Sequence, residues 1–189
     1  MPPRKKVLWL VPILAIMFFG GLILVIALLL RPHPSFKAFV IPSVSMCPTI
    51  CLNEHMIADM SAFQNTRPHH GDLIVLKHPT IEGLLIKRVI GLGGDTVESD
   101  GTGRITVNGI ALQPPPVCGN PAPITTGEIP PPSITKVPEG FLFVIGDNLT
   151  NSWDSRLEGF GMVTLDQVRG KPKFIYFSTR LSRIGCELR

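Results

Sequence analysis

The chain has 189 residues, a formal net charge of +4 and a hydrophobic fraction of 44%. This length leaves room for one membrane segment and one compact domain of ordinary size. The basic residues are scattered apart from the cluster Arg4-Lys5-Lys6, whereas a nucleic-acid-binding surface would need a clustered basic stripe with interleaved aromatic side chains. The composition therefore argues against nucleic acid as a partner, and the single cluster suits a segment that faces anionic lipid.

Residues 7–30 form an uninterrupted apolar stretch without a charged side chain, and their number is about that needed for a helix to cross a bilayer. A cleaved secretory signal is the alternative, but its apolar region would be shorter and would end in small residues, whereas this one ends in three leucines before Arg31. The positive cluster before the stretch predicts a cytoplasmic N-terminus. We therefore expect a single-pass protein of the inner (plasma) membrane, with its catalytic part on the outer side.

This topology divides the chain into four predicted parts. They are a basic cytoplasmic N-terminus (residues 1–6), a transmembrane helix (7–30), a short linker (31–35) and an extracytoplasmic domain (36–189).

The extracytoplasmic domain carries strand patterns, which are short runs rich in β-branched and aromatic residues bounded by turn residues. These predicted strands are at residues 36–41, 54–59, 71–79, 84–90, 141–145 and 174–177, with a hairpin at 104–112 around Asn108-Gly109. Residues 113–138 are instead rich in proline, threonine and glycine. That composition predicts a stiff, exposed insertion without regular sheet, with a ligand for a partner domain as the alternative.

Residues 42–49 (PSVSMCPT) follow the first predicted strand and contain the candidate nucleophile, Ser45. A serine hydroxyl needs a base to remove its proton and donors to hold the oxyanion that attack creates. The five histidines lie in loop-like or polar contexts, so Lys87 is the better candidate base. On an alternating strand Lys87 faces the same way as its apolar neighbours, and burial among them favours a neutral amine. Arg88 cannot serve, because a guanidinium stays protonated.

Three sequence boxes carry a family resemblance. Residues 42–49 resemble the nucleophile box of type I signal peptidases, the serine endopeptidases of the S26 type. Residues 86–95 (IKRVIGLGGD) are similar to their lysine box, and residues 146–156 (GDNLTNSWDSR) resemble their late box. The three boxes stand in the family's order and extend over roughly residues 36–177. Family members usually have proline where this chain has Gly93, and Arg-Asp where it has Leu149-Thr150.

The resemblance implies a mostly β domain of antiparallel sheet that follows one transmembrane helix, and a Ser-Lys dyad without a cofactor. Ser45 would attack the scissile carbonyl and Lys87 would remove its proton. The Ser43 hydroxyl and the Ser45 backbone N–H would hold the oxyanion. We expect three residues of the late box to support the dyad, namely Ser152, which would position Lys87, and Asp154 and Arg156 as an ion pair.

The implied substrates are exported precursor proteins with signal peptides, bound as an extended strand and cut after small residues such as alanine. We assign Met46, Ile41 and Pro42 to the substrate-binding cleft, with a purely core position as the alternative for Met46. A dedicated peptidase that matures a pilin-like subunit for secretion or conjugation machinery is an alternative function. A non-catalytic, membrane-tethered binding protein is another, and so is a self-cleaving repressor, which would need a DNA-binding region.

The four cysteines are Cys47, Cys51, Cys118 and Cys186. Cys47 and Cys51 are four apart, but no second close pair of ligands accompanies them, which argues against zinc. On the oxidising side of a membrane the four allow more than one full pairing. A Cys118–Cys186 bridge would pin the proline-rich insertion to the tail. Cys47 is an alternative nucleophile, although Ser45 occupies the position that matches the family's box.

Overall fold

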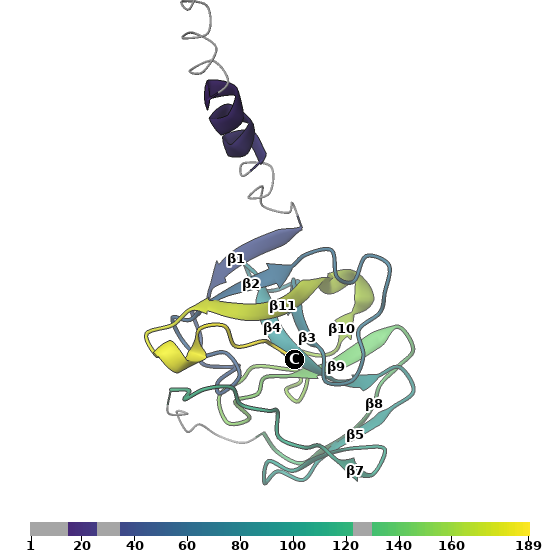
Figure 1. Cartoon of the computed structure of the whole chain (residues 1–189). Coiled ribbons are helices and arrows are strands. Elements are labelled where there is room, and N and C mark those ends of the chain that lie inside the picture. The colour runs from purple at the N-terminus through teal and green to yellow at the C-terminus, as the bar shows by residue number, and fades with distance from the viewer. Residues whose placement is uncertain (1–14, 26–34, 123–129) are drawn as a thin grey trace, which may run out of the picture. The chain divides into compact units, whose positions relative to one another are not determined.

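A computed structural model describes residues 15–25, 35–122 and 130–189, and the chain falls into two compact units, 1–34 and 35–189 (Figure 1). In the first unit, residues 15–25 are helical. No helix within the described ranges is long and apolar enough to cross a membrane. The predicted segment 1–6, most of the linker, and residues 7–14 and 26–30 of the predicted span lie outside the described residues.

The second unit is built from antiparallel strands in two sheets. Seven strands form one sheet in the order β1-β2-β11-β3-β4-β9-β10, and four form another in the order β7-β6-β5-β8. Two short 3-10 helices, η1 (Leu165–Gln167) and η2 (Leu181–Arg183), follow β10 and β11. The strands are β1 (Phe36–Val40), β2 (His55–Asp59), β3 (Leu73–Leu76), β4 (Leu85–Leu92), β5 (Thr96–Ser99), β6 (Ile105–Val107), β7 (Ile110–Ala111), β8 (Ser133–Lys136), β9 (Phe141–Ile145), β10 (Val163–Thr164) and β11 (Val168–Phe177).

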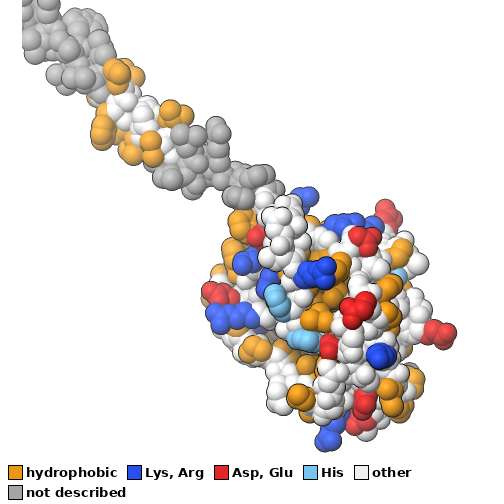
Figure 2. All heavy atoms as spheres, turned by 90° about the vertical axis from the view of Figure 1, so that its right-hand side faces the viewer, with side chains coloured by type: hydrophobic (Ala, Val, Ile, Leu, Met, Phe, Trp, Pro, Cys, Tyr) orange, Lys and Arg blue, Asp and Glu red, His pale blue; other side chains and the backbone are white. Residues whose placement is uncertain are grey.

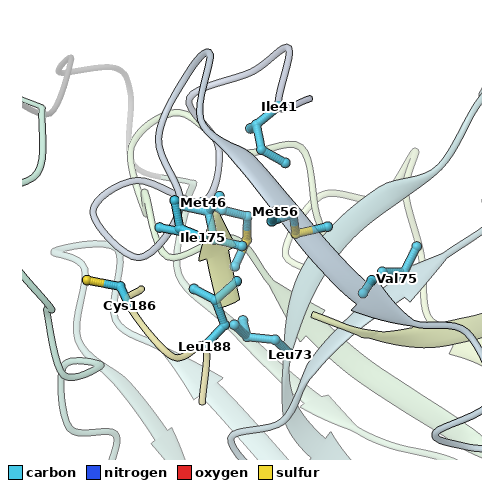
Figure 3. Close-up of a cluster of buried hydrophobic side chains, with 10 residues drawn as sticks. Ile41, Met46, Met56, Leu73, Val75, Ile175, Cys186 and Leu188 are labelled. Carbon is cyan, nitrogen blue, oxygen red and sulfur yellow. The ribbon is translucent and has the colours of Figure 1, made fainter. Parts of the chain in front are cut away.

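The centre of the larger sheet is apolar on both faces. Every residue of β3 is buried, as a continuous run of branched aliphatic side chains in an inner strand requires. The four residues of β3 divide between two clusters of buried hydrophobic side chains, and a third cluster joins β4 and β9 to β5 and β6 of the smaller sheet. Figure 3 shows the first cluster, in which Met46 and Met56 lie among side chains from β3, β11 and the C-terminal tail.

The predicted mostly antiparallel β fold is confirmed, and the hairpin around Asn108-Gly109 is present as β6 and β7. Both turn residues have positive φ, 51° at Asn108 and 79° at Gly109, which suits a tight hairpin turn. The prediction that residues 113–138 contain no regular sheet is wrong at their C-terminal end, where β8 pairs with β5. The sequence Ser-Ile-Thr-Lys of β8 is short and follows three prolines, so its alternation is a weak signal on its own. It forms a strand of the smaller sheet because it pairs with β5.

Charges on the surface are mixed. On the face drawn in Figure 2, basic and acidic side chains are interspersed with apolar ones. A groove that tracks a nucleic-acid backbone would instead collect basic side chains in one stripe.

Candidate active site

Strand β4 places two adjacent cations in the interior. Lys87 is 2% exposed and Arg88 is 7% exposed. Lys87 pairs with Ile74 of β3, and Arg88 pairs with both Leu73 of β3 and Ile145 of β9. Because successive side chains of a strand point to opposite faces, the two cations enter different environments on the two sides of the sheet.

The Lys87 side has a hydroxyl partner. The Lys87 Nζ donates a hydrogen bond to the Ser152 Oγ at 2.8 Å. Burial lowers the pKa of Lys87 to about 8, while the nearby charges of Asp154 and Asp147 oppose this shift and that of Arg156 adds to it. A lysine with this pKa supplies an appreciable neutral fraction near neutral pH, which is the form that can accept a proton.

The nucleophile box is bound to the turn that follows β9. The Asn148 backbone N–H donates to the Ser45 carbonyl oxygen at 3.0 Å, and the Asn148 Nδ2 donates to the Val44 carbonyl oxygen at 3.2 Å. A Cβ added to Gly146 would lie 2.3 Å from the Ser152 Oγ and 2.4 Å from the Ser45 carbonyl oxygen. The Ser152 side chain and the Ser45 backbone therefore both lie close to Gly146, where no larger residue fits. Ser152 in turn contacts Lys87.

The two serines of the nucleophile box face each other. The Ser43 and Ser45 hydroxyl oxygens lie 3.2 Å apart, with Ser43 exposed and Ser45 half-buried. This geometry leaves the Ser43 hydroxyl within reach of an oxygen atom that develops charge beside Ser45.

Asp154 and Arg156 form a buried ion pair. The Arg156 Nε and Nη2 donate to the two Asp154 carboxylate oxygens, each at 2.8 Å. Asp154 also accepts from the Gly146 N–H at 3.0 Å, and the Arg156 Nη1 donates to the Leu149 carbonyl oxygen at 2.8 Å. Such bidentate pairs fix geometry as well as charge, so this pair braces the loop that carries Ser152.

A second buried pair on the Arg88 side was not among the predicted site residues. The Arg88 Nε and Nη2 donate to the Asp147 carboxylate at 2.8 and 2.7 Å, and the Thr49 hydroxyl donates to the same carboxylate. The Arg88 Nη1 also donates to the carbonyl oxygens of Gly71 and Arg189, at 2.6 and 2.8 Å. The sequence signal for this pair is Arg88 itself, a second cation within the apolar run 84–90. Asn148 and Gly146 were missed as well, although they begin the late box.

The predicted substrate-binding residues divide by burial. Ile41 and Met46 are 4% and 2% exposed and belong to the first hydrophobic cluster (Figure 3), whereas Pro42 is exposed. The burial of Met46 favours its alternative, a core position. Isoleucine and methionine are among the residue types that are most often fully buried in protein interiors.

All four cysteines are paired, as Cys47–Cys51 and Cys118–Cys186. The expected bridge between the proline-rich insertion and the tail is therefore present. The alternative of Cys47 as a thiol nucleophile is wrong, because its sulfur is already bonded to Cys51.

The site thus combines a buried lysine that contacts Ser152 with a more accessible serine, Ser45, in the neighbouring nucleophile box. In an antiparallel β domain, this is the arrangement of a serine hydrolase that uses lysine as its base. The family model described as signal peptidase, peptidase S26, matches residues 12–177. The chain belongs to this family.

Relatives that carry the name signal peptidase I cover most of the chain. One from Leptolyngbya laminosa is 35% identical over 154 residues, which are 74% of this chain and 68% of that protein. One from Bacillus amyloliquefaciens is 32% identical over 158 residues, covering 80% and 79%. Signal peptidase I S of Bacillus subtilis (strain 168) is 33% identical over 160 residues, covering 81% and 83%. The protein is accordingly a type I signal peptidase and a serine endopeptidase, and the pilin-maturing alternative is not favoured.

Proposed function

We propose that the protein removes signal peptides from exported precursors with Ser45 as nucleophile and Lys87 as general base. The observation that carries this assignment is the lysine buried in β4 with a pKa lowered to about 8. Its amine is held at 2.8 Å by Ser152, and Ser152 shares the close surroundings of Gly146 with Ser45.

The reaction starts with neutral Lys87, which removes the proton of the Ser45 hydroxyl as its oxygen attacks the scissile carbonyl carbon. The Ser43 hydroxyl and the Ser45 backbone N–H donate to the resulting oxyanion. The lysine ammonium returns its proton to the leaving amine, which leaves an acyl group on Ser45. Neutral Lys87 then takes a proton from water, whose oxygen attacks the acyl carbon. The lysine ammonium gives this proton to the departing Ser45 oxygen, which restores the Ser45 hydroxyl and neutral Lys87. Ser152 keeps the amine in place through both steps.

The substrate binds as an extended strand, with small residues before the cut. Strand β1 supports this binding mode because it pairs only with β2 within the described part of the sheet, and an open edge can accept another strand. The signal peptidase I relatives support exported precursors as the substrate class.

The catalytic unit works at the outer surface of the membrane, anchored by the single span 7–30 with its N-terminus in the cytoplasm. The apolar, uncharged composition of that stretch supports an anchor. Phe36 and Val40 on β1 and Phe177 on β11 are 43%, 57% and 46% exposed. These side chains would contact lipid better than water.

The test is cleavage of a precursor with alanine one and three places before the bond, reconstituted in vesicles with the full chain. We expect one product whose mass places the cut after the alanine. Ser45→Ala should lower kcat by at least about 1,000-fold. Ser61→Ala is the matched control, because Ser61 hydrogen-bonds locally to Asp59, and it should cleave normally. Wild-type turnover by Ser45→Ala would refute the nucleophile assignment.

A further inference from the structure

Arg183 is a fully buried arginine outside the three sequence boxes. It lies in η2 and is 0% exposed. Its Nε and Nη2 donate to the two carboxylate oxygens of Glu54 at 2.9 and 3.0 Å. The Nη2 also donates to the Thr49 carbonyl oxygen at 2.8 Å, and the Nη1 donates to the Cys118 carbonyl oxygen. One guanidinium thus joins the tail, the proline-rich insertion and the segment that follows the nucleophile.

Glu54 completes this contact from the other side. Its carboxylate accepts from the Cys51 backbone N–H at 2.8 Å and from the Ser178 hydroxyl at 3.1 Å. Burial by itself would raise the pKa of Glu54, but the hydrogen bonds from Arg183 and from the Cys51 N–H hold it below its ordinary value. The carboxylate is therefore ionised at neutral pH, and every donor around it faces a charged acceptor.

The backbone that this pair holds is the loop from Ser45 to β2. Arg183 binds the loop at the Thr49 carbonyl oxygen, and Glu54 binds it at the Cys51 N–H. A disulfide between Cys47 and Cys51 closes the same loop. At its other end the loop is tied to the late box by the bond from the Asn148 N–H to the Ser45 carbonyl oxygen. Ser45 therefore sits between two anchors, one in the late box and one in the tail.

We propose that Arg183 and Glu54 form a positioning pair that holds the Ser45 loop in its reactive conformation. This inference rests on the proposed role of Ser45 as nucleophile. Neither residue of the pair contacts the reacting hydroxyl. They act through the backbone at Thr49 and Cys51.

The geometry favours positioning over a simple contribution to stability. A buried ion pair adds little net stability, because removing both charges from water offsets most of their attraction. This pair instead fixes the position of the loop, because its side chains hydrogen-bond to the Thr49 carbonyl oxygen and the Cys51 N–H. A misplacement of reacting groups by about 1 Å can cost on the order of 100-fold in rate, so a loop with a free end would be costly at this position.

The tail is held where it can present Arg183. Cys186 is disulfide-bonded to Cys118, and the Asn120 N–H donates to the Ser182 hydroxyl at 3.1 Å. A lysine at position 183 would keep the charge but could not reproduce the planar fork that reaches four acceptor atoms. Arg183 is thus the residue through which the insertion and the tail reach the nucleophile loop.

The experiment compares Arg183→Lys and the isosteric Glu54→Gln with wild type, using the full chain in vesicles and the precursor described above. We expect kcat to fall by about 10- to 100-fold, with KM changed by less than about 3-fold. The pH at half-maximal kcat should stay where it is, because Lys87 lies in β4 and donates to Ser152. Measurements are made at a temperature where circular dichroism shows the wild-type fold.

Val163→Ala is the control for lost stability. Val163 is 0% exposed and belongs to the second hydrophobic cluster, away from the nucleophile loop. It should lower Tm and keep kcat. Wild-type kcat in folded Glu54→Gln and Arg183→Lys would overturn the proposal, and so would an equal loss of kcat in Val163→Ala. If Arg183→Lys fails to fold, Glu54→Gln decides. Activity of Ser45→Ala would instead contradict the assignment of Ser45 as nucleophile. Failure of the positioning proposal and failure of the proposed function therefore give different results.

Discussion

Lys87 and Arg88 are neighbours in β4, both cationic and both buried, yet their surroundings differ. Arg88 is matched by the Asp147 carboxylate through two hydrogen bonds and by two carbonyl oxygens. Lys87 donates to the neutral Ser152 hydroxyl, and within the described part of the chain it has no ion-pair partner. One cation is thus held charged, and the other is held where its charge is poorly compensated.

This difference separates structure from chemistry within two adjacent residues. A guanidinium cannot lose its proton, so a buried arginine needs a carboxylate. An ammonium can lose its proton, so a buried lysine without a carboxylate partner has a lowered pKa and becomes a base. The alternation of a β-strand is enough to present the two side chains to two different environments.

The largest loss of activity should come from placing arginine at position 87 as well as at position 88. Lys87→Arg keeps a cation in the site but removes the group that can become neutral, so cleavage should fall by at least about 1,000-fold. The assay is precursor cleavage with the folded, reconstituted protein. Activity within about 10-fold of wild type would mean that Lys87 acts only as a positive charge.

Arg88→Met tests the other side of the comparison. It leaves the buried Asp147 carboxylate without its main partner, which should cost about 3 to 5 kcal/mol in the free energy of unfolding. Urea denaturation of the catalytic unit measures this loss. The double variant Arg88→Met with Asp147→Leu removes both charges and should recover most of the stability. No recovery in the double variant would mean that the loss reflects packing and the bonds to Gly71 and Arg189.

Lys87→Met should raise the free energy of unfolding at pH 7, whereas Arg88→Met should lower it. In the folded protein the pKa of Lys87 is about 8, against an ordinary value of 10.5. Between these values the unfolded chain binds more protons, so wild-type stability rises with pH from about 8 to about 10.5 and is lower below that window. The variant lacks this penalty and should be more stable than wild type at pH 7, by about 1 to 3 kcal/mol. Urea denaturation at pH 7 and pH 10 should show the gain shrinking at high pH. A variant less stable than wild type at pH 7 would contradict the poorly compensated charge.

Much of this arrangement was accessible from the sequence because it depends on local patterns. The apolar runs of β3 and β9 indicate buried strands, and Asn108-Gly109 indicates a hairpin. Ser45, Lys87 and Ser152 stand at the matching positions of three family boxes, and burial of Lys87 follows from its apolar neighbours. A pattern of this kind gives the direction of a side chain along its own strand.

The rest depends on contacts between distant segments, which local patterns do not specify. Arg183 stands in a tail without periodicity, and only the folded chain brings it to Glu54. The Arg88–Asp147 pair likewise needs the register of β4 against β9. Met46 lies within a turn, where the direction of a side chain is not set by alternation, and it packs into the core. β8 required β5 as a partner before its short alternation could form a strand.

The pH dependence of kcat tests the central claim most directly, because that claim is that burial lowers the pKa of Lys87 far enough for its neutral form to act as the base. With saturating precursor, kcat should rise with pH as Lys87 loses its proton and should reach half its plateau near pH 8. The measurement uses wild-type protein in vesicles, with circular dichroism at each pH to show that the fold persists. A half-maximum near pH 10.5, the ordinary value for lysine, would contradict a base whose pKa is lowered by burial.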